Sequence, residues 1–139
     1  MEILNRKAKF NYFIIDEIEA GIVLNGTEIK SIRKGKINIE DAYARIKNDE
    51  VYLTNMFIAK YEEANRFNHD ERRERKLLLH KSEIRKLSKK IKLENYTLIP
   101  LKLYFKKSHA KILLGLCKGK KLYDKRQTIK NRDLERETK

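Results

Sequence analysis

The feature that most constrains the fold is an alternation of apolar and polar residues in three stretches of the chain. In the first, apolar residues fall on even positions from Phe10 to Leu24, with Asp16 as the exception. In the other two, every second residue is apolar or β-prone over 97–105 and again over 110–116. A period of two residues buries one face of a β-strand. The first stretch is long for one strand, so a bend is expected near Gly21.

Turn residues between β-prone runs predict two hairpins. Asn48-Asp49-Glu50 separates the runs 42–46 and 51–58, and residues 106–109 separate the second and third alternating stretches. Pro100 lacks an N–H, so it should lie at a sheet edge or at a non-bonded position.

Two helices are expected outside these strands. The first begins at Thr27, which can cap it, and ends at Gly35, although Asn25-Gly26 also fits a hairpin turn. The second covers residues 79–93, where Ile84, Leu87 and Ile91 share one face and basic residues cover the other.

Together these elements predict a mainly β protein with short helices. About five or six antiparallel strands and two or three peripheral helices suit a small OB-like β-barrel, a common oligonucleotide-binding form. Strands and helices do not alternate as in βαβ units, which argues against a parallel sheet. The spacing alone does not separate a barrel from a sandwich.

The charge indicates the kind of partner. The formal net charge is +14. Such a surface attracts RNA, DNA or an anionic membrane, although a basic protein without such a partner is the plain alternative.

Two further observations indicate a cytoplasmic protein. Neither a signal peptide nor an apolar run of about 20 residues is found, so no membrane partner is expected. The single cysteine, Cys117, cannot form an internal disulfide and lies in the apolar run 112–117, which favours a small core residue in a reducing compartment.

The C-terminal segment is strongly basic and has few apolar residues. From Lys118 onward it carries nine basic and four acidic residues. In a helix, Lys121 and Lys125, like Arg126 and Lys130, would be like-charged neighbours, and each such pair costs a few tenths of a kcal/mol. The isolated tail should therefore be largely disordered and could fold on a phosphate surface. A merely solubilising tail is the alternative.

Two other segments combine charge with features suited to RNA. The loop 60–76 interleaves aromatic rings, which can stack on unpaired bases, with arginines, which can hold phosphate; these residues are Tyr61, Phe67, His69, Arg66, Arg72, Arg73, Arg75 and Lys76. The same rings could instead fix the loop to the barrel. The basic segment 5–9 could be an RNA-binding arm or a frayed terminus.

No catalytic or metal site is predicted. His69, His80 and His109 lack metal-ligand spacing, and no glycine-rich phosphate loop is found. Glu19, Glu28, Asp41 and Glu83 could in principle supply an acid/base pair, but nothing in the sequence brings two of them together. A binding protein without catalytic site or cofactor is therefore favoured over an RNA-processing enzyme.

Six stretches, in the same order along the chain, resemble the bacterial SsrA-binding protein family. They are Asn5-Arg6-Lys7-Ala8, Glu19-Ala20-Gly21-Ile22, Gly26-Thr27-Glu28-Ile29-Lys30-Ser31, Arg73-Glu74-Arg75-Lys76-Leu77-Leu78-Leu79-His80, Thr97-Leu98-Ile99-Pro100-Leu101 and Gly119-Lys120-Lys121-Leu122-Tyr123-Asp124-Lys125-Arg126. The last is the most specific.

The resemblance implies an OB-like barrel that binds the tRNA-like part of transfer-messenger RNA. It also implies a tail that becomes helical in the decoding centre and mRNA channel, so that the protein rescues stalled ribosomes. The expected division is a barrel over 1–119 and a flexible tail over 120–139. A monomer is expected, with transfer-messenger RNA and the ribosome as partners. A structural ribosomal RNA-binding protein on a similar barrel is the alternative.

The resemblance also assigns residues to the two interfaces. Glu19, Leu78 and Lys111 match the RNA-binding face of the barrel, to which the charge pattern adds Asn5, Lys7, Arg75 and Lys76. Asp124, Lys125 and Arg126 match the decoding-centre segment, with Lys118, Lys120, Lys121 and Tyr123 beside them. A carboxylate such as Glu19 can accept from a base N–H or a 2′-OH.

Overall fold

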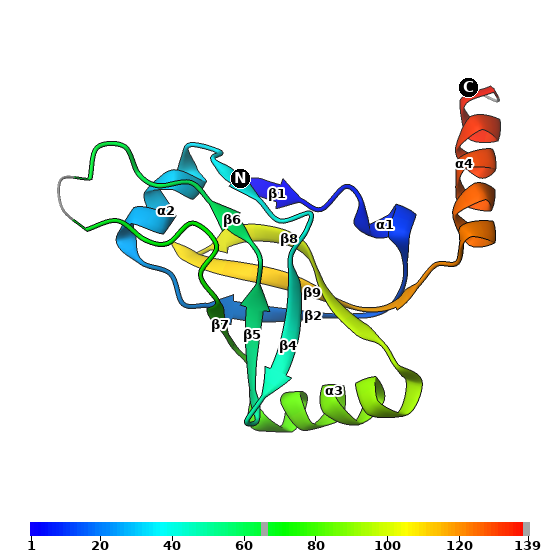
Figure 1. The fold of residues 1–139 in the computed structure, drawn as a ribbon, viewed down its shortest axis with the longest axis horizontal. Helices are drawn as coiled ribbons and strands as arrows, with labels where there is room; N and C mark the ends of the chain where they lie inside the picture. Colours follow the sequence, from blue (N-terminus) through cyan, green and yellow to red (C-terminus); the bar gives the residue numbers. More distant parts are fainter. Residues whose placement is uncertain (65–66, 138–139) are drawn as a thin grey trace.

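The structure is a computed structural model and describes residues 1–64 and 67–137 (Figure 1). Its elements, in chain order, are β1 (Glu2–Leu4), α1 (Ala8–Asn11), β2 (Tyr12–Ile22), α2 (Gly26–Arg33), β3 (Ile37–Asn38), β4 (Tyr43–Lys47), β5 (Glu50–Thr54), β6 (Phe57–Ile58), β7 (Arg75–Leu78), α3 (Lys81–Glu94), β8 (Thr97–Lys106), β9 (His109–Gly119) and α4 (Leu122–Glu137).

Seven strands form one antiparallel sheet that curls into a ring. The strand order is β1-β8-β4-β5-β7-β2-β9, and an additional β8–β9 pairing links β9 back to β8, so that β8 to β9 form the ring and β1 pairs with β8 beside it. Along the ring, β4 and β8 meet at the single register pair Ala44–Leu98. The prediction of a mainly β, barrel-like fold is confirmed, and the described residues contain four helices rather than two or three.

Both predicted hairpins are present, and left-handed turn residues close them. Asn48 and Asp49 connect β4 to β5 with φ values of 51° and 58°, and Lys107 and Ser108 connect β8 to β9 with φ values of 50° and 68°. Two consecutive positive φ angles match the right-handed twist of paired strands, so each turn keeps its hairpin tightly paired.

The first alternating stretch bends at a different place from the one expected. The register of β2 against β9 shifts between Ile14 and Asp16, not at Gly21. Because one extra residue moves the following side chains to the opposite face, Ile14 packs in a small second cluster, whereas Ile18 packs against the main core.

A second shift does the same in β8. There the register against β9 moves between Pro100 and Lys102. Ile99 and Leu101 therefore join the second cluster, whereas Leu103 joins the main core. The sequence prediction of one buried face over 97–105 is wrong for this reason. The second cluster also contains Cys117, which is fully buried as predicted.

Helix α2 begins one residue earlier than predicted. Asn25, and not Thr27, is its N-cap, and the backbone N–H of Asn25 donates to Glu28 Oε1 at 2.8 Å. Gly35, at φ 74°, follows the helix and permits the left-handed turn that ends it.

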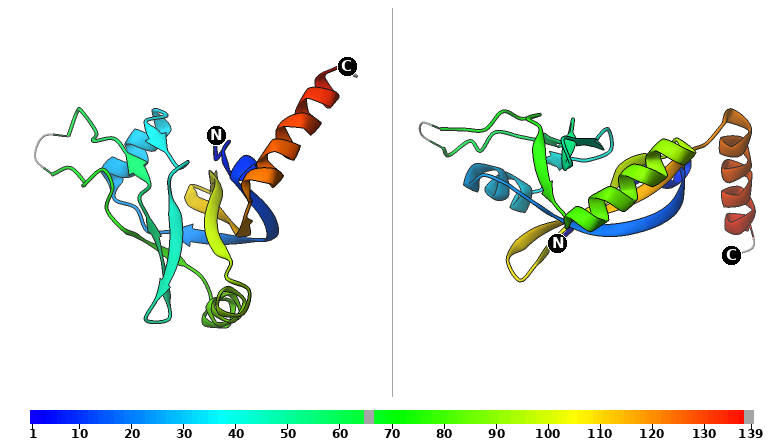
Figure 2. Two further views of the ribbon diagram at one scale, coloured as in Figure 1. Left: turned by 45° about the vertical axis from the view of Figure 1, so that its right-hand side comes forward. Right: turned by 90° about the horizontal axis from the view of Figure 1, so that it is seen from below.

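Helix α3 crosses one end of the ring (Figure 2). It buries Ile84 and Leu87 against the core, as its periodicity predicted.

Candidate nucleic-acid interface

Three predicted RNA contacts lie together on the outer face of the sheet. Gly21 of β2 is opposite Leu78 of β7 on one side and Lys111 of β9 on the other. Glu19 lies two residues earlier in β2, so its side chain leaves the same face as this row. Residues more than 90 positions apart in the sequence thus form one surface.

Gly21 allows this row to be compact. A Cβ at this position would lie 3.3 Å from the Cβ of Leu78, which is tighter than an ordinary contact. The Leu78 side chain therefore lies close over the bare backbone of β2 while 53% of it stays exposed. An exposed leucine in this place gives the surface an apolar spot between charged groups.

Glu19 is held in a fixed orientation by two neighbours from β8. The hydroxyl of Tyr104 donates to Glu19 Oε2, and Lys106 Nζ lies 3.8 Å from Glu19 Oε1. The hydrogen bond from Tyr104, with the charges of Lys106 and Lys111, holds the pKa of Glu19 below its usual value. Burial and the bond to Glu19 raise the pKa of Tyr104 to about 12, so the phenol keeps its proton at neutral pH.

Lys76 extends this surface along β7. It precedes Leu78 by two residues and therefore leaves the same face of the strand. Its Nζ lies 3.6 Å from Glu50, and its side chain remains 43% exposed. The surface formed by these residues is called the Glu19 patch below; its members are Glu19, Gly21, Lys76, Leu78, Tyr104, Lys106 and Lys111.

Arg75 was predicted to bind RNA, and its burial contradicts this. Its side chain is fully buried, and its Nε donates to Glu28 Oε2 at 2.5 Å while Nη1 donates to the Met56 carbonyl at 2.6 Å. Arg73 Nη2 donates to the other oxygen of Glu28 at 2.5 Å. A buried guanidinium with these partners cannot reach a phosphate, so Arg75 is structural.

The fully buried Glu28 and Arg75, with the partly exposed Arg73, form an ionic triad that joins α2 to β7. Burial alone would raise the pKa of Glu28, but hydrogen bonds from Arg73, from the Asn25 backbone and from Arg75 hold it below the usual value. The sequence presented Glu28 only as one of four carboxylates that could in principle supply an acid/base pair, and nothing in its position pointed to its two arginine partners.

The predicted N-terminal contacts separate into one buried and one exposed residue. Asn5 is only 8% exposed, and its Nδ2 donates to the Pro100 carbonyl at 2.9 Å. The prediction that Asn5 binds RNA is therefore wrong, because this side chain ties the N-terminal segment to β8. Lys7 is 59% exposed, with its Nζ 3.7 Å from Glu40, and stays a candidate phosphate contact.

The loop 60–76 buries one of its three aromatic residues and leaves another largely exposed. His69 is buried between Thr27 Oγ1 at 3.0 Å and the Ile58 carbonyl at 2.8 Å, so it does not stack on a base. Tyr61 lies under Lys30 and Lys34. Phe67 is 84% exposed and can stack on a base. Arg66 lies outside the described residues.

The predicted disorder of the tail is contradicted by α4, which is helical from Leu122 to Glu137. Three contacts hold its first turns in place. Asp124 Oδ2 accepts from the Lys121 backbone N–H at 3.2 Å, which caps the helix. Lys120 Nζ donates to the Lys9 carbonyl at 2.8 Å and to Thr128 Oγ1 at 2.7 Å.

The rest of α4 extends away from the ring of strands (Figures 1 and 2). Lys125 and Arg132 lie over the Phe10 ring at 5.8 and 5.6 Å, which places the helix beside α1. Tyr123 is 76% exposed, and Lys118, Lys121 and Arg126 are also exposed. These tail residues form a second basic surface, separate from the Glu19 patch.

The described residues contain neither a metal-ligand cluster nor a membrane-spanning helix. Across residues 1–64 and 67–132, no group of three or more His, Cys, Asp or Glu side chains is arranged to hold a metal ion. Nor does any helix in this part of the chain have the length and apolar character needed to cross a membrane. The two basic surfaces therefore remain the candidate sites.

Comparison with known proteins gives a consistent result. A family model described as SmpB protein matches residues 2–139. SsrA-binding proteins from Staphylococcus aureus strains JH1 and NCTC 8325 are each 59% identical over 133 residues, which is 96% of this chain and 86% of theirs. A solved structure described as "tmRNA-SmpB: a journey to the center of the bacterial ribosome" is 48% identical, with a TM-score of 0.72, over 87% of this chain and 85% of that one.

Proposed function

The chain belongs to the SmpB protein family, and from this premise we propose that it is a transfer-messenger RNA-binding adaptor that rescues stalled ribosomes by trans-translation. The barrel binds the tRNA-like part of the RNA, and the tail, already helical from Leu122 to Glu137, enters the decoding centre and mRNA channel. The protein acts in the cytoplasm, where ribosomes are, and positions RNA without catalysing a reaction.

The Glu19 patch is the observation that carries the barrel's role. It combines the three kinds of contact that folded RNA requires. Lys76, Lys106 and Lys111 offer charge to phosphates, Leu78 offers apolar area to an unstacked base, and the ionised Glu19 accepts a hydrogen bond from a base N–H or a 2′-OH. Because Tyr104 and Lys106 hold the carboxylate in place, little order has to be gained on binding.

The tail supports the second half of the proposal. Its predicted decoding-centre residues Asp124, Lys125 and Arg126 occupy the first turns of α4, where capping and Phe10 hold the helix. The Glu19 patch and α4 can thus bind two RNA molecules at the same time. We place the functional boundary between the barrel, 1–119, and the tail, 120–139.

Binding to transfer-messenger RNA tests the barrel's role. The protein should bind this RNA much more tightly than an unrelated structured RNA of equal length. In Lys111→Ala the slope of log Kd against log salt should fall by about 0.9, the value for one lost duplex phosphate contact. Lys86→Ala removes one charge from α3 and should leave the slope unchanged. Equal binding to both RNAs would favour the structural ribosomal RNA-binding protein instead.

Truncation tests the division of labour. A chain that ends at Gly119 should bind transfer-messenger RNA with nearly the full affinity and support no peptide tagging on ribosomes stalled on truncated mRNA. Tagging at the full rate by this truncated protein would show that the tail is not needed, and the proposed role of α4 would be wrong.

A further inference from the structure

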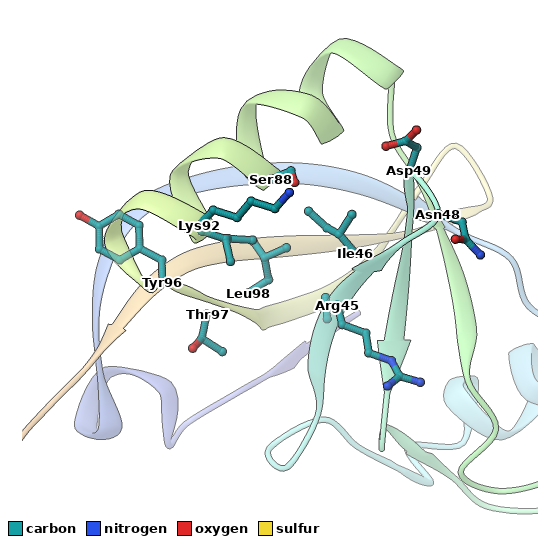
Figure 3. Close-up of a pocket in the computed structure, with 11 residues that line it drawn as sticks. Arg45, Ile46, Asn48, Asp49, Ser88, Lys92, Tyr96, Thr97 and Leu98 are labelled. Carbon is teal, nitrogen blue, oxygen red and sulfur yellow. The ribbon is translucent and has the colours of Figure 1, made fainter.

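A groove between β4 and α3 belongs to neither of the two basic surfaces described above. It arises where the ring of strands is weakest, because β4 and β8 pair only through Ala44 and Leu98. Beyond this pair the two strands separate, and α3 spans the space between them (Figure 3). The result is an open cavity of about 510 Å³. Small-molecule sites commonly enclose about 300–1,000 Å³, so a nucleoside fits this volume.

The walls of the groove suit a base. Ile46, Ile91 and Leu98 supply apolar surface from β4, α3 and β8. Ser88 and Thr97 add hydroxyl groups that can bond the edge of a base, and Tyr96 lies at one end with its ring partly exposed. In Figure 3 the Lys92 side chain extends along the helix toward Ser88, over the cavity, whereas Arg45 points away from α3.

A basic stripe runs along α3 beside the groove, and of its three members only Lys92 lines the cavity. Arg85, Lys89 and Lys92 are spaced four and three residues apart, which places them in one stripe along the helix, and all three are exposed. In the part of the chain that the structure describes, none of them lies within 4.0 Å of a carboxylate oxygen. The opposite side of α3 differs, because Lys90 lies 3.7 Å from Asp16 there.

We propose that this groove binds an unpaired nucleotide of single-stranded RNA, with the base between β4 and α3 and the adjoining phosphates on the stripe Arg85, Lys89 and Lys92. Apolar walls beside a positive track are the usual arrangement for single-stranded nucleic acid, because bases bury their faces while cations hold the backbone. The proposal adds a site to the RNA-binding function above and rests on different residues.

Photo-crosslinking of the full-length protein tests the site directly. The probe is a single-stranded RNA octamer with 4-thiouridine at one internal position. After irradiation, peptides that contain residues 88–98 or 44–49 should carry most of the cross-links. Cross-links spread over the surface in proportion to exposed lysine, or concentrated on α4, would overturn the proposal. Specific binding of an unstructured peptide in place of the octamer would also overturn it.

Two double variants with equal loss of charge distinguish a specific RNA-binding site from non-specific electrostatic attraction. Arg85→Ala/Lys92→Ala should weaken octamer binding about tenfold and reduce its salt slope by about 1.4, the value for two single-strand phosphate contacts. Lys86→Ala/Lys90→Ala lowers the net charge equally on the other side of the helix and should have little effect. Equal weakening in both variants would refute the site.

The test is independent of the Glu19 patch. Lys111→Ala should weaken binding to transfer-messenger RNA and leave the octamer cross-links at the groove unchanged. Loss of the groove cross-links in Lys111→Ala would place the octamer on the Glu19 patch and remove the second site. Failure of transfer-messenger RNA binding with an intact groove signal would instead count against the proposed function alone.

Discussion

At the scale of single residues, the Glu28 triad shows how a charged pattern can be structural. Glu28 and Arg75 are both fully buried, and each of their ionic atoms has a partner within the protein. Removal of one member of such a group leaves the others buried without charge compensation, which costs far more than loss of a surface pair. The triad therefore fixes α2 and the end of the long loop to β7.

Glu28→Gln is expected to lower the free energy of unfolding by about 3 kcal/mol or more, because the fully buried Arg75 loses its counter-charge and the partly exposed Arg73 loses its partner. Urea unfolding followed by circular dichroism measures the change. Glu74→Gln, which breaks the exposed pair between Glu74 and Arg45, is the control and should cost about 1 kcal/mol or less. Similar losses of unfolding free energy in the two variants would show that the triad stabilises the protein no more than an exposed ion pair does.

The same carboxylate predicts a pH dependence. The folded-state pKa of Glu28 lies below its usual value, so the unfolded chain binds the proton more readily. The contribution of Glu28 to stability is thus complete above pH 4.5, the ordinary value, and is lost as the pH falls through the folded-state pKa. Thermal unfolding between pH 6 and pH 3 should show a steeper decline for the wild type than for Glu28→Gln. If the Tm of the two proteins fell with pH in parallel, the proposed contribution of Glu28 to the pH dependence would be wrong.

Three of the candidate RNA ligands show which site residues could not be identified from the sequence. Three side chains, Arg75, Asn5 and His69, have the chemistry of RNA ligands. Each instead forms a hydrogen bond within the protein to a partner distant in the sequence: Glu28, the Pro100 carbonyl and Thr27, respectively. Residue type and local pattern carry no information on such partners. Glu19, Leu78 and Lys111 came from family resemblance, and only the strand register brings them together.

At the scale of elements, the two register shifts show the limit of alternation as a signal. A period of two residues correctly located β2, β8 and β9, but the extra residues at the shifts change the buried face within a strand. The sequences of β2 and β8 show continuous alternation across the shifts only because the face that is buried before each shift, next to α1, is also apolar. Alternation therefore predicted one buried face in each strand, where the structure divides the buried side chains between a main core and a small second cluster.

Helix α4 was mispredicted because its stability comes from contacts outside its own sequence. Its repelling basic pairs disfavour an isolated helix, but Lys120 bonds both to the Lys9 carbonyl and to Thr128. Lys120→Ala should therefore reduce the helical content of residues 122–132, measured from backbone NMR chemical shifts. Lys121→Ala is the matched control, because only its backbone N–H bonds to Asp124. An unchanged helix in Lys120→Ala would show that capping alone suffices.

At the scale of the whole molecule, the net charge of +14 opposes the compact state as well as attracting RNA. Higher salt screens this self-repulsion. An increase of NaCl from about 20 to about 150 mM should raise the Tm of the free protein by a few degrees. A variant with Lys60→Glu and Lys107→Glu has a net charge lower by four and should show a smaller rise in Tm. A Tm that falls with salt in both proteins would mean that favourable surface pairs outweigh the repulsion.

The long β2–β9 ladder, which pairs Tyr12 with Gly119, has a consequence during synthesis of the protein on the ribosome. A ribosome adds about 5–20 residues per second, so β2 waits roughly 5–20 s before its partner strand exists. During that time its edge is open to other nascent chains. Asp16, Glu17 and Glu19 lie in this strand, and charges on an exposed edge discourage association. Glu19, which we assign to RNA recognition, thus also helps to protect the nascent chain from aggregation.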